Sequence, residues 1–249
     1  MSDPKTSDEP AVAAKLKEAM ANKSAKKYES ALRLIDEALS IQPDSPVVLL
    51  TKGVFLAELG LCNDSLLCYD KMIQLDPTSA VAYRLKGATF ELQGSHAKAS
   101  DCFAKAIELE PNNMDLRMNL ANSFKRQKKF EMALKCLQQI LEVEPMNPKI
   151  HYSIGITLGD MGNYEAALGF FDEALRLKAD FNDAALAKAF VLTKLGRKDE
   201  AKQYTDKLLE TKNESADSKD ANIASLNDSC RRDFEASQRK FKDSFAPPK

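Results

Sequence analysis

The chain has 249 residues, of which 44% are hydrophobic and 29% charged, a composition typical of a protein with a packed core. Its formal net charge of -1 lacks the basic excess that general binding to nucleic acid or anionic lipid requires, so we expect no nucleic-acid partner. No apolar stretch approaches the roughly 20 residues that span a bilayer, and no integral membrane segment is predicted.

The first ten residues, MSDPKTSDEP, lack the basic start and the apolar run of a secretory signal. We expect residues 1–11 to be disordered and the protein to be cytoplasmic. Among five cysteines there is no CxxC pair, so we predict no metal site and no cofactor. Cys68, Cys102 and Cys136 are evenly spaced along the chain, and we interpret them as small apolar packing residues on equivalent helices.

A tandem repeat begins near residue 12, where a first helical pattern starts. Its clearest marks are four evenly spaced prolines, Pro43, Pro77, Pro111 and Pro145, which recur at one phase. Each proline ends a helix, since it disfavours helix at the preceding residue and has no N–H to donate. Ala179 stands at the fifth place. The predicted units are 12–45, 46–79, 80–113, 114–147, 148–181 and a degraded sixth, 182–212.

Each unit contains two helical patterns around a short turn. The first helix ends at a glycine in four units (Gly60, Gly94, Gly162 and Gly196), because glycine adopts the left-handed conformation at little steric cost. Lys26 and Lys128 stand at this place in units one and four. Those two turns must therefore use a less permissive residue or a different geometry.

The second helix of each unit carries a small residue, followed four positions later by a large one. The small residues are Ala31, Ser65, Ala99, Ala133, Ala167 and Ala201, and the large ones are Ile35, Tyr69, Phe103, Leu137 and Phe171. Further apolar residues follow three positions on, and this spacing marks one face of an α-helix. After each proline comes a predicted N-cap for the next helix: Ser45, Ser79, Asn113 or Asn147.

These residues resemble the tetratricopeptide repeat family, whose helix–turn–helix unit has the same length as the repeat found here. The family's small residue of the second helix matches the alanines above, its closing proline matches the four prolines, and its first-helix glycine matches Gly53, Gly87 and Gly155. The family's large aromatic early in the first helix is replaced by residues such as Arg117 and His151. The resemblance implies an all-α fold, a right-handed α-solenoid of about six stacked units, whose first helices line a concave groove that binds peptides or partner proteins.

Positions that face inward in the family give candidate partner-binding residues: Arg84, Met118, Asn119, Asn122, Arg126, Tyr152 and Ile156. Asparagine amides can pair with an extended peptide backbone, and arginine can hold a carboxylate with two hydrogen bonds. Tyrosine adds a flat apolar anchor with a polar tip. The alternative is that these polar groups only solvate an exposed helix face.

The leading prediction is a non-enzymatic adaptor that binds a protein or peptide partner in this groove. The alternatives are a self-assembling scaffold and a co-chaperone-like adaptor. The two-carboxylate clamp of the chaperone-binding branch is absent from the first three units, where its positions hold Leu16, Met20, Thr51, Val81 and Leu85. No catalytic motif is present, and both histidines, His96 and His151, fall at core phases of the repeat.

Residues 213–249 break the pattern, beginning with a polar linker, NESADSKDAN. Beyond it, Leu226, Cys230, Phe234, Phe241 and Phe245 fall on one stripe of a predicted amphipathic C-terminal helix. Three roles are open for this segment: capping the last repeat, occupying the groove, or binding a membrane or partner. Capping is favoured, since the last unit of a solenoid otherwise exposes apolar surface.

Overall fold

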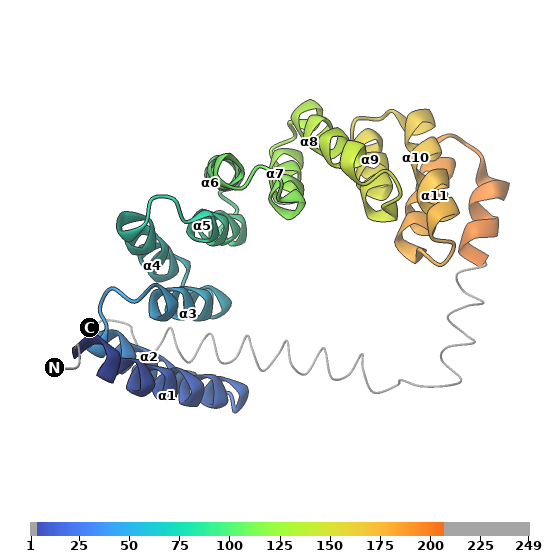
Figure 1. The fold of residues 1–249 in the computed structure, drawn as a ribbon. Helices are drawn as coiled ribbons and strands as arrows, with labels where there is room; N and C mark the ends of the chain where they lie inside the picture. The colour runs from blue at the N-terminus through green and yellow to red at the C-terminus, as the bar shows by residue number, and fades with distance from the viewer. Residues whose placement is uncertain (1–3, 207–249) are drawn as a thin grey trace, which may run out of the picture. The chain divides into compact units, whose positions relative to one another are not determined.

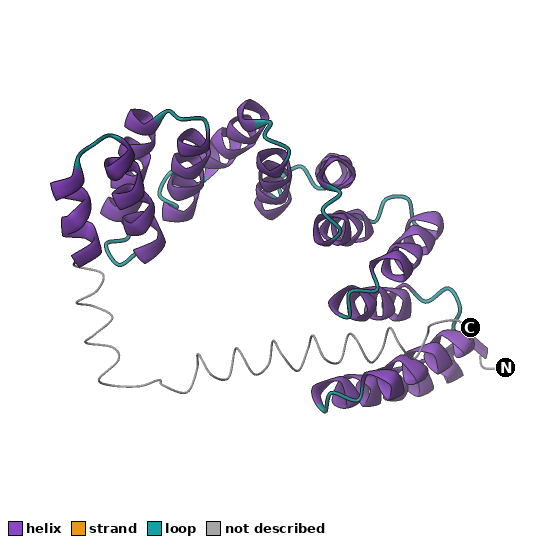
Figure 2. Ribbon diagram, turned by 180° about the vertical axis from the view of Figure 1, so that it is seen from behind, coloured by secondary structure: helices purple, strands orange, loops and turns teal. Residues whose placement is uncertain are grey.

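The structure, a computed structural model, describes residues 4–206, and every regular element in that range is a helix (Figures 1 and 2). The helices are α1 Pro4–Ser24, α2 Tyr28–Ile41, α3 Pro46–Glu58, α4 Cys62–Leu75, α5 Ala80–Leu92, α6 His96–Leu109, α7 Met114–Arg126, α8 Phe130–Val143, α9 Pro148–Asp160, α10 Tyr164–Leu177 and α11 Asn182–Lys194. A further helix begins at residue 198 and is described as far as 206. The predicted linker and C-terminal amphipathic helix lie outside the described residues.

The chain divides into two compact units, Met1–Ser123 and Phe124–Lys249, and the division falls within α7. In the first unit α1 packs on α2, α3 on α4, and α5 on α6, and each pair also contacts the next. In the second unit α9 packs on α10, with α8 on one side and α11 on the other. Odd-numbered helices are the first helices of the repeats, and even-numbered helices are the second.

The N-terminus differs from the sequence prediction, because residues 4–11 are helical and belong to α1. Pro4 occupies the first position of the helix, where a missing N–H costs nothing. Val12 and Ala19 are buried against α2 in a cluster with Ile35, which anchors α1 to its partner. The helix also continues through Pro10, where one backbone hydrogen bond is lost.

Close packing between paired helices explains the glycines inside the first helices. A Cβ atom built on Gly53 would lie 2.6 Å from Cε1 of Tyr69, and one on Gly155 would lie 2.6 Å from Cε1 of Phe171. Gly87 meets Phe103 in the same way, at 2.9 Å. Where the second helix has an aliphatic residue instead, the first helix has alanine, as with Ala19 and Ile35 or Ala121 and Leu137. The small residue of the first helix and the large residue of the second helix therefore have complementary sizes.

The turns at Lys26 and Lys128 keep the geometry of the glycine turns. Their φ angles are +60° and +59°, and the four glycines at the same place have φ between +72° and +81°. A side chain with a Cβ atom is strained in this left-handed region. The sequence left open either a different turn geometry or a lysine in the same left-handed turn. The structure shows the second: Lys26 and Lys128 adopt the glycine geometry.

Helix starts agree with the predicted N-caps at three of four positions. The side chain of Ser79 accepts from the N–H of Ala82 at 3.4 Å, and that of Asn147 accepts from the N–H of Lys149 at 3.0 Å. Asn113 accepts from the N–H of Leu116 at 3.3 Å. The side chain of Ser45 makes no such hydrogen bond. Its helix starts instead with Pro46 at the first position, which is already restricted to a helical φ.

Arg117 and His151, which stand where the family has a large aromatic residue early in the first helix, share one structural role. Nε2 of His151 donates to the carbonyl oxygen of Pro145 at 2.8 Å, and the guanidinium of Arg117 donates to the carbonyl of Pro111. Both acceptors are closing prolines of the preceding repeat. His151 is only 8% exposed, as its core phase predicted, whereas His96 is half-buried and bonds Glu91. Arg117 and His151 therefore fasten one repeat to the next through a carbonyl that follows a helix end.

Ion pairs join a second helix to the following first helix at equivalent places. Lys52 pairs with Asp36 at 2.7 Å and Lys86 with Asp70 at 2.5 Å, while Lys188 pairs with Asp172. These lysines share one repeat phase, where Leu120 and Ile154 stand in units four and five. Both of those residues are buried. The same place in the repeat is thus ionic in units two, three and six and apolar in units four and five.

The cysteines at the repeated phase are reduced thiols inside the packed helices. Cys68 and Cys136 are buried and Cys102 is half-buried. Burial raises the pKa of the Cys68 and Cys102 thiols, which favours their neutral form. This agrees with their interpretation as apolar packing residues.

Candidate functional site

The seven candidate groove residues all lie on first helices. Arg84 is on α5, and Met118, Asn119 and Asn122 are on α7. Arg126 is the last residue of α7, while Tyr152 and Ile156 are on α9. Asn122 and Arg126 are exposed and the other five are half-buried. Asn119 and Asn122 belong to the first compact unit, whereas Arg126 and Tyr152 belong to the second. Because the predicted cluster of these four residues joins two units, it stays a prediction.

The structure brings Tyr152 and Ile156 together at a pocket of the second unit, called here the C-terminal pocket. The cavity has a volume of about 370 Å³ and lies between α9 and α11. Its apolar lining includes Tyr152, Ile156, Phe171, Leu186 and Phe190. The side chains of Leu186 and Phe190 are 49% and 59% exposed. Large apolar groups left this open around a cavity make it a candidate binding surface.

Tyr152 is held in place by aromatic neighbours from two other segments. Its ring centroid lies 6.1 Å from that of Phe171 and 5.1 Å from that of Phe181, both in tilted arrangements. Burial raises the pKa of its phenol, and the nearby Asp183 carboxylate raises it further. The phenol is therefore a neutral hydroxyl at physiological pH, able to donate one hydrogen bond into the pocket.

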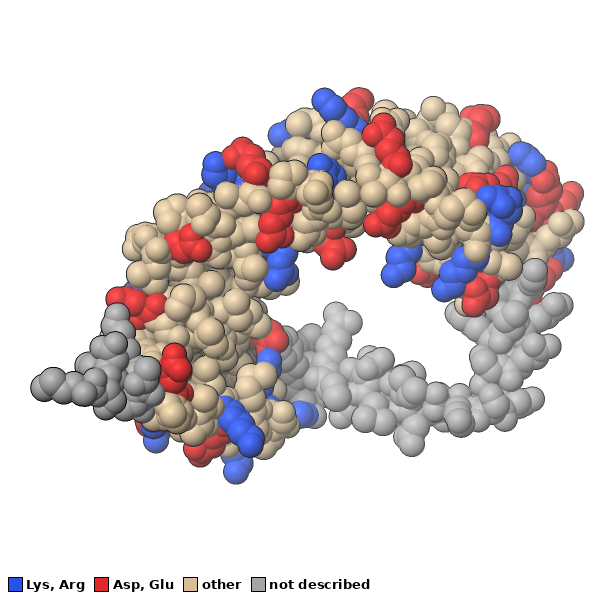
Figure 3. Space-filling model, in the orientation of Figure 1, with Lys and Arg blue, Asp and Glu red and all other residues tan. Residues whose placement is uncertain are grey.

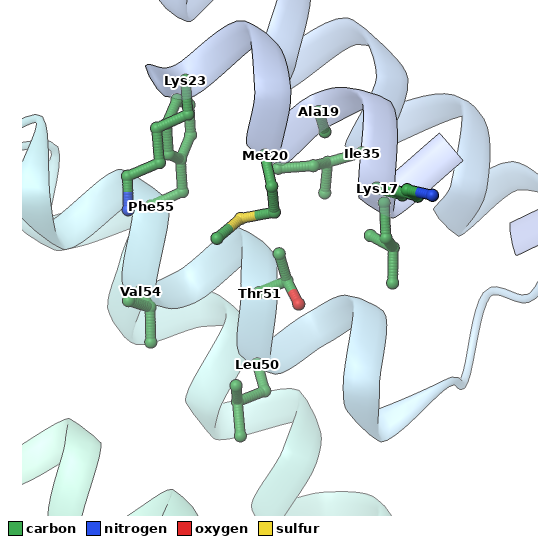
Figure 4. Close-up of a pocket in the computed structure, with 10 residues that line it drawn as sticks. Lys17, Ala19, Met20, Lys23, Ile35, Leu50, Thr51, Val54 and Phe55 are labelled. Carbon is green, nitrogen blue, oxygen red and sulfur yellow. The ribbon is translucent and has the colours of Figure 1, made fainter. Parts of the chain in front are cut away.

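A second cavity, the N-terminal pocket, lies between α1 and α3 of the first unit. Its volume is about 330 Å³. Figure 4 shows Met20 of α1 extending toward Thr51 of α3, with Leu50 and Val54 on the facing turns. Lys23 lies over the Phe55 ring at 5.7 Å and pairs with Glu58 at 2.5 Å. This pocket, too, is mainly apolar.

The two pockets are lined by the same positions of the repeat. Leu16, Met20, Leu50 and Val54 of the N-terminal pocket correspond to Tyr152, Ile156, Leu186 and Phe190 of the C-terminal pocket, four repeats further along the chain. Ile35 and Phe171, the large residues of the second helix, also correspond. The same architectural place therefore forms a cavity in two separate units, and the side chains set its size and polarity.

The pockets differ in the charges near their openings. Lys17 and Lys23 line the N-terminal pocket, whereas Asp160 and Asp183 line the C-terminal pocket. Elsewhere, on the face drawn in Figure 3, acidic and basic side chains are interspersed over each unit. Local charge at the pockets, rather than a field of one sign, is therefore available to select a ligand.

A chain of polar side chains joins the third repeat to the first helix of the fourth. Nδ1 of His96 lies 2.9 Å from Oε2 of Glu91, whose other oxygen accepts from the hydroxyl of Ser123. In this chain the carboxylate stands between the serine and the histidine. Ser123 is fully buried, so the three side chains form a structural link between α5, α6 and α7.

Residues 4–206 form neither a metal-binding cluster nor a membrane-spanning helix. That part of the chain contains no group of three or more His, Cys, Asp or Glu side chains placed to hold a metal ion. None of its helices is both long enough and apolar enough to cross a membrane.

The paired helices, the register of the repeat and the turn geometry define a helical repeat protein, and the comparisons identify its family. The family model described as Psidin, N-terminal TPR repeats region, matches residues 15–156, more than half of the chain. The model described as Tetratricopeptide repeat matches residues 160–221. This chain belongs to the tetratricopeptide repeat family, and its fold is an α-solenoid of such units. Among curated protein sequences, none matches significantly.

Solved structures show the same fold at low sequence identity. A MamA protein matches with a TM-score of 0.60 and 22% identity, covering 68% of this chain and 92% of its own. YrrB, titled a TPR protein with an unusual peptide-binding site, has a TM-score of 0.56 and 21% identity, with coverages of 71% and 91%. PilF of Pseudomonas aeruginosa has a TM-score of 0.64 and 17% identity, with coverages of 82% and 93%. The fold is one that serves as a scaffold for protein–protein interaction.

The inward-facing positions of the family predict Tyr152, Ile156, Leu186 and Phe190 on one face of the first helices, but they do not predict the cavity that these residues line. Leu186 and Phe190 share the repeat phases of Tyr152 and Ile156, and their apolar character was the available signal. Asp183 carries no such signal, because its position in the unit is held by Val47, Val81, Asp115 and Lys149 elsewhere. Its closeness to Tyr152 depends on how α11 packs on α9.

Proposed function

We propose that this chain is a non-enzymatic adaptor that binds a peptide or protein partner on the face lined by its first helices. The observation that carries the proposal is the pair of apolar pockets at equivalent places in two units. Each combines a preformed cavity with exposed apolar groups, Met20 at the N-terminal pocket and Leu186 and Phe190 at the C-terminal pocket, the usual composition of an anchor site for a partner's side chains. The printed title of YrrB, which names a peptide-binding site on a similar fold, supports it.

The remaining candidate residues supply the polar part of the proposed surface. Asn122 and Arg126 are exposed on α7, and Asn119 is half-buried there. We assign amide pairing with a partner backbone to the asparagines, and carboxylate binding to Arg126. Arg84, Met118, Tyr152 and Ile156 complete the proposed set of partner-binding residues.

The proposal is tested by affinity capture with the tagged full-length chain, followed by mass spectrometry. The site variant is Leu186→Ser with Phe190→Ser. The matched control is Met132→Ser with Val143→Ser, which removes two apolar side chains of the same unit that are 47% and 60% exposed but lie on α8. We expect the site variant to lose a partner that both the native chain and the control retain, with unchanged far-ultraviolet circular dichroism.

The polar residues are tested by Arg126→Ala with Tyr152→Ala in the same assay. We expect weaker capture of the same partner, because an arginine contact and an aromatic anchor are both removed. Capture that is equally strong in the native chain, the pocket variant and this variant would contradict the proposal. Light scattering tests the alternative of a self-assembling scaffold. If the apparent molecular mass of the native chain rises with protein concentration, and the pocket variant has a lower mass, then the partner is a second copy of the chain.

A further inference from the structure

Two aspartates line the C-terminal pocket and form no ion pair within residues 4–206. Asp160 is the last residue of α9 and Asp183 lies in the first turn of α11, and both are exposed. Neither has an ion-pair partner among the described residues 4–206, whereas Asp172 of the same unit pairs with Lys188. An apolar cavity with two such carboxylates fits a ligand that has a large apolar side chain flanked by basic residues.

A segment of that composition is present in the same chain. Residues 239–242 read RKFK, so that Phe241 is flanked by Arg239, Lys240 and Lys242. The nearby Phe234 lies between Asp233 and Glu235 and follows Arg231 and Arg232, so its surroundings carry no net charge. Of the phenylalanines Phe234, Phe241 and Phe245, only Phe241 therefore has a positive net charge within three residues on either side, which matches the charges of the pocket.

We infer that Phe241 of this chain occupies the C-terminal pocket, with its basic neighbours beside Asp160 and Asp183. The phenylalanine ring would contact Tyr152, Ile156 and Phe190, replacing water on apolar side chains that are otherwise exposed. The tail then acts as an internal competitor for the surface that the proposed partner uses. This deepens the proposed function, on which it rests, by naming an occupant and a means of regulation.

The covalent connection permits this contact. The last described helix lies against α11, because the hydroxyl of Tyr204 accepts from Lys188 and Ala201 is buried with Val191 and Leu192. Phe241 follows residue 206 by about 35 positions, which can span roughly 110 Å when extended. The 13 residues of α11 extend over only about 20 Å. Chain length therefore does not limit access to the pocket.

The same contacts define what a cap would cover. The helix that begins at residue 198 is the second helix of the sixth repeat and packs on α11 through Ala201 and Tyr204, so a cap on the last repeat would lie against this helix and not at the pocket between α9 and α11. The two aspartates, by contrast, have no ion-pair partner within residues 4–206, and Leu186 and Phe190 are exposed although Lys194 lies over the Phe190 ring at 5.2 Å. The groove role, one of the three left open by the sequence, is the one that the pocket favours.

Tethering makes even a weak contact effective. A short linked segment experiences an effective concentration on the order of 1 mM, so a tail with an intrinsic Kd of about 100 µM would fill the pocket in about nine molecules out of ten. A free ligand that needs the same pocket would then bind about tenfold more weakly.

The test uses the full-length chain with Phe190→Trp, which gives a single tryptophan at the pocket because the native sequence has none. The probe is a synthetic peptide of residues 236–246, ASQRKFKDSFA, titrated while tryptophan emission is recorded. We expect the peptide to bind saturably to the protein that carries both Phe190→Trp and Phe241→Ser, because its tail no longer competes for the pocket. The peptide should bind about tenfold more weakly to the protein that carries Phe190→Trp alone. The matched control, Phe190→Trp with Phe234→Ser, should behave like Phe190→Trp alone.

The charges of the pocket are tested separately. Asp160→Asn with Asp183→Asn, added to the Phe241→Ser protein, should weaken peptide binding at least about fivefold at low salt.

Three outcomes would overturn the inference: no peptide binding to the Phe241→Ser protein, equal binding with and without Phe241, or a Phe234→Ser control that behaves like Phe241→Ser. A tenfold difference that disappears on dilution of the protein would instead identify the tail of a second copy, and would overturn the intramolecular assignment. Failure of the proposed function is separable. If the peptide binds as expected but partner capture is unaffected by Leu186→Ser with Phe190→Ser, the proposed function fails alone. If that capture is lost while the peptide never binds, only the tail assignment fails.

Discussion

At the scale of single residues, this fold depends on complementary sizes across each helix pair. Gly155 and Phe171 show it most clearly, since a methyl group on the glycine would lie 2.6 Å from the ring. Where alanine replaces the glycine, as at Ala121, the facing position holds a smaller residue, Leu137. Interiors are packed densely enough that a single added carbon must displace its neighbours.

Gly155→Ala should lower the free energy of unfolding by about 1–2 kcal/mol, because overpacking outweighs the helix propensity that alanine adds. Gly169→Ala is the matched control, since Gly169 lies within α10 and a Cβ atom there meets nothing within 4 Å. It should raise stability by up to about 1 kcal/mol. Urea denaturation followed by circular dichroism measures both.

The double variant Gly155→Ala with Phe171→Leu reproduces the pairing found at Ala121 and Leu137. We expect a coupling of at least about 1 kcal/mol, so that the double variant loses less stability than the sum of the two single variants. Strict additivity across this cycle would show that the two side chains do not constrain each other.

Backbone strain at the turns is a second effect at the residue scale. Lys128 has φ of +59°, where a non-glycine residue is disfavoured. Lys128→Gly should therefore stabilise the protein by about 1 kcal/mol, and Gly162→Ala, at the equivalent turn, should destabilise it by a similar amount. Thermal denaturation should move the two midpoints in opposite directions, and a shift of the same sign would refute the strain argument.

At the scale of helices, each start depends on the few residues that precede it. Asn147 accepts from the N–H of Lys149 at 3.0 Å and also donates to the carboxylate of Glu144 at 2.6 Å. Ser45 holds the same position before α3 but its side chain makes no cap hydrogen bond. Equivalent positions in the repeat are therefore not equivalent in energy.

Asn147→Ala should cost about 1 kcal/mol of stability, because a free N–H of α9 loses its acceptor. Ser45→Ala, the matched control, should cost less than about 0.5 kcal/mol, since Pro46 already starts α3. Chemical denaturation of both variants provides the comparison, and equal losses would mean that the side-chain cap contributes nothing.

At the scale of the whole molecule, contacts are local. Helices of each unit contact their neighbours in sequence, as α2 contacts α1 and α3, and α10 contacts α9 and α11. A solenoid of this kind has a stability that is the sum of repeat and nearest-neighbour terms. A destabilising substitution in one repeat should therefore lower the stability of that repeat and of its direct neighbours, and have little effect on more distant repeats.

Ile35→Ala provides the test, since Ile35 is buried in a cluster that joins α1, α2 and α3. We expect a loss of about 2–5 kcal/mol, expressed as faster amide hydrogen exchange in α1–α3. Exchange in α9–α11 should stay within about twofold of the native rate. Acceleration of the same size in α9–α11 would show a single cooperative core and contradict the local picture.

The sequence alone determined the helix pairs and the turns between them. This was possible because the signals are local: proline at a helix end, glycine or lysine at a turn, and small and large residues at helical spacing all recur with the same period. Tyr152 and Ile156 were assigned to a first helix on the same ground.

Tertiary structure alone decided what surrounds those residues. The pocket at Tyr152 exists because α11 brings Leu186, Phe190 and Asp183 to α9, and no spacing within one repeat records that contact. It also decided that α1 starts at Pro4, because burial of Val12 and Ala19 against α2 overrides a polar, proline-containing beginning. Period and helix ends follow from neighbouring residues, whereas cavities and charges at their openings depend on side chains of different repeats meeting in space.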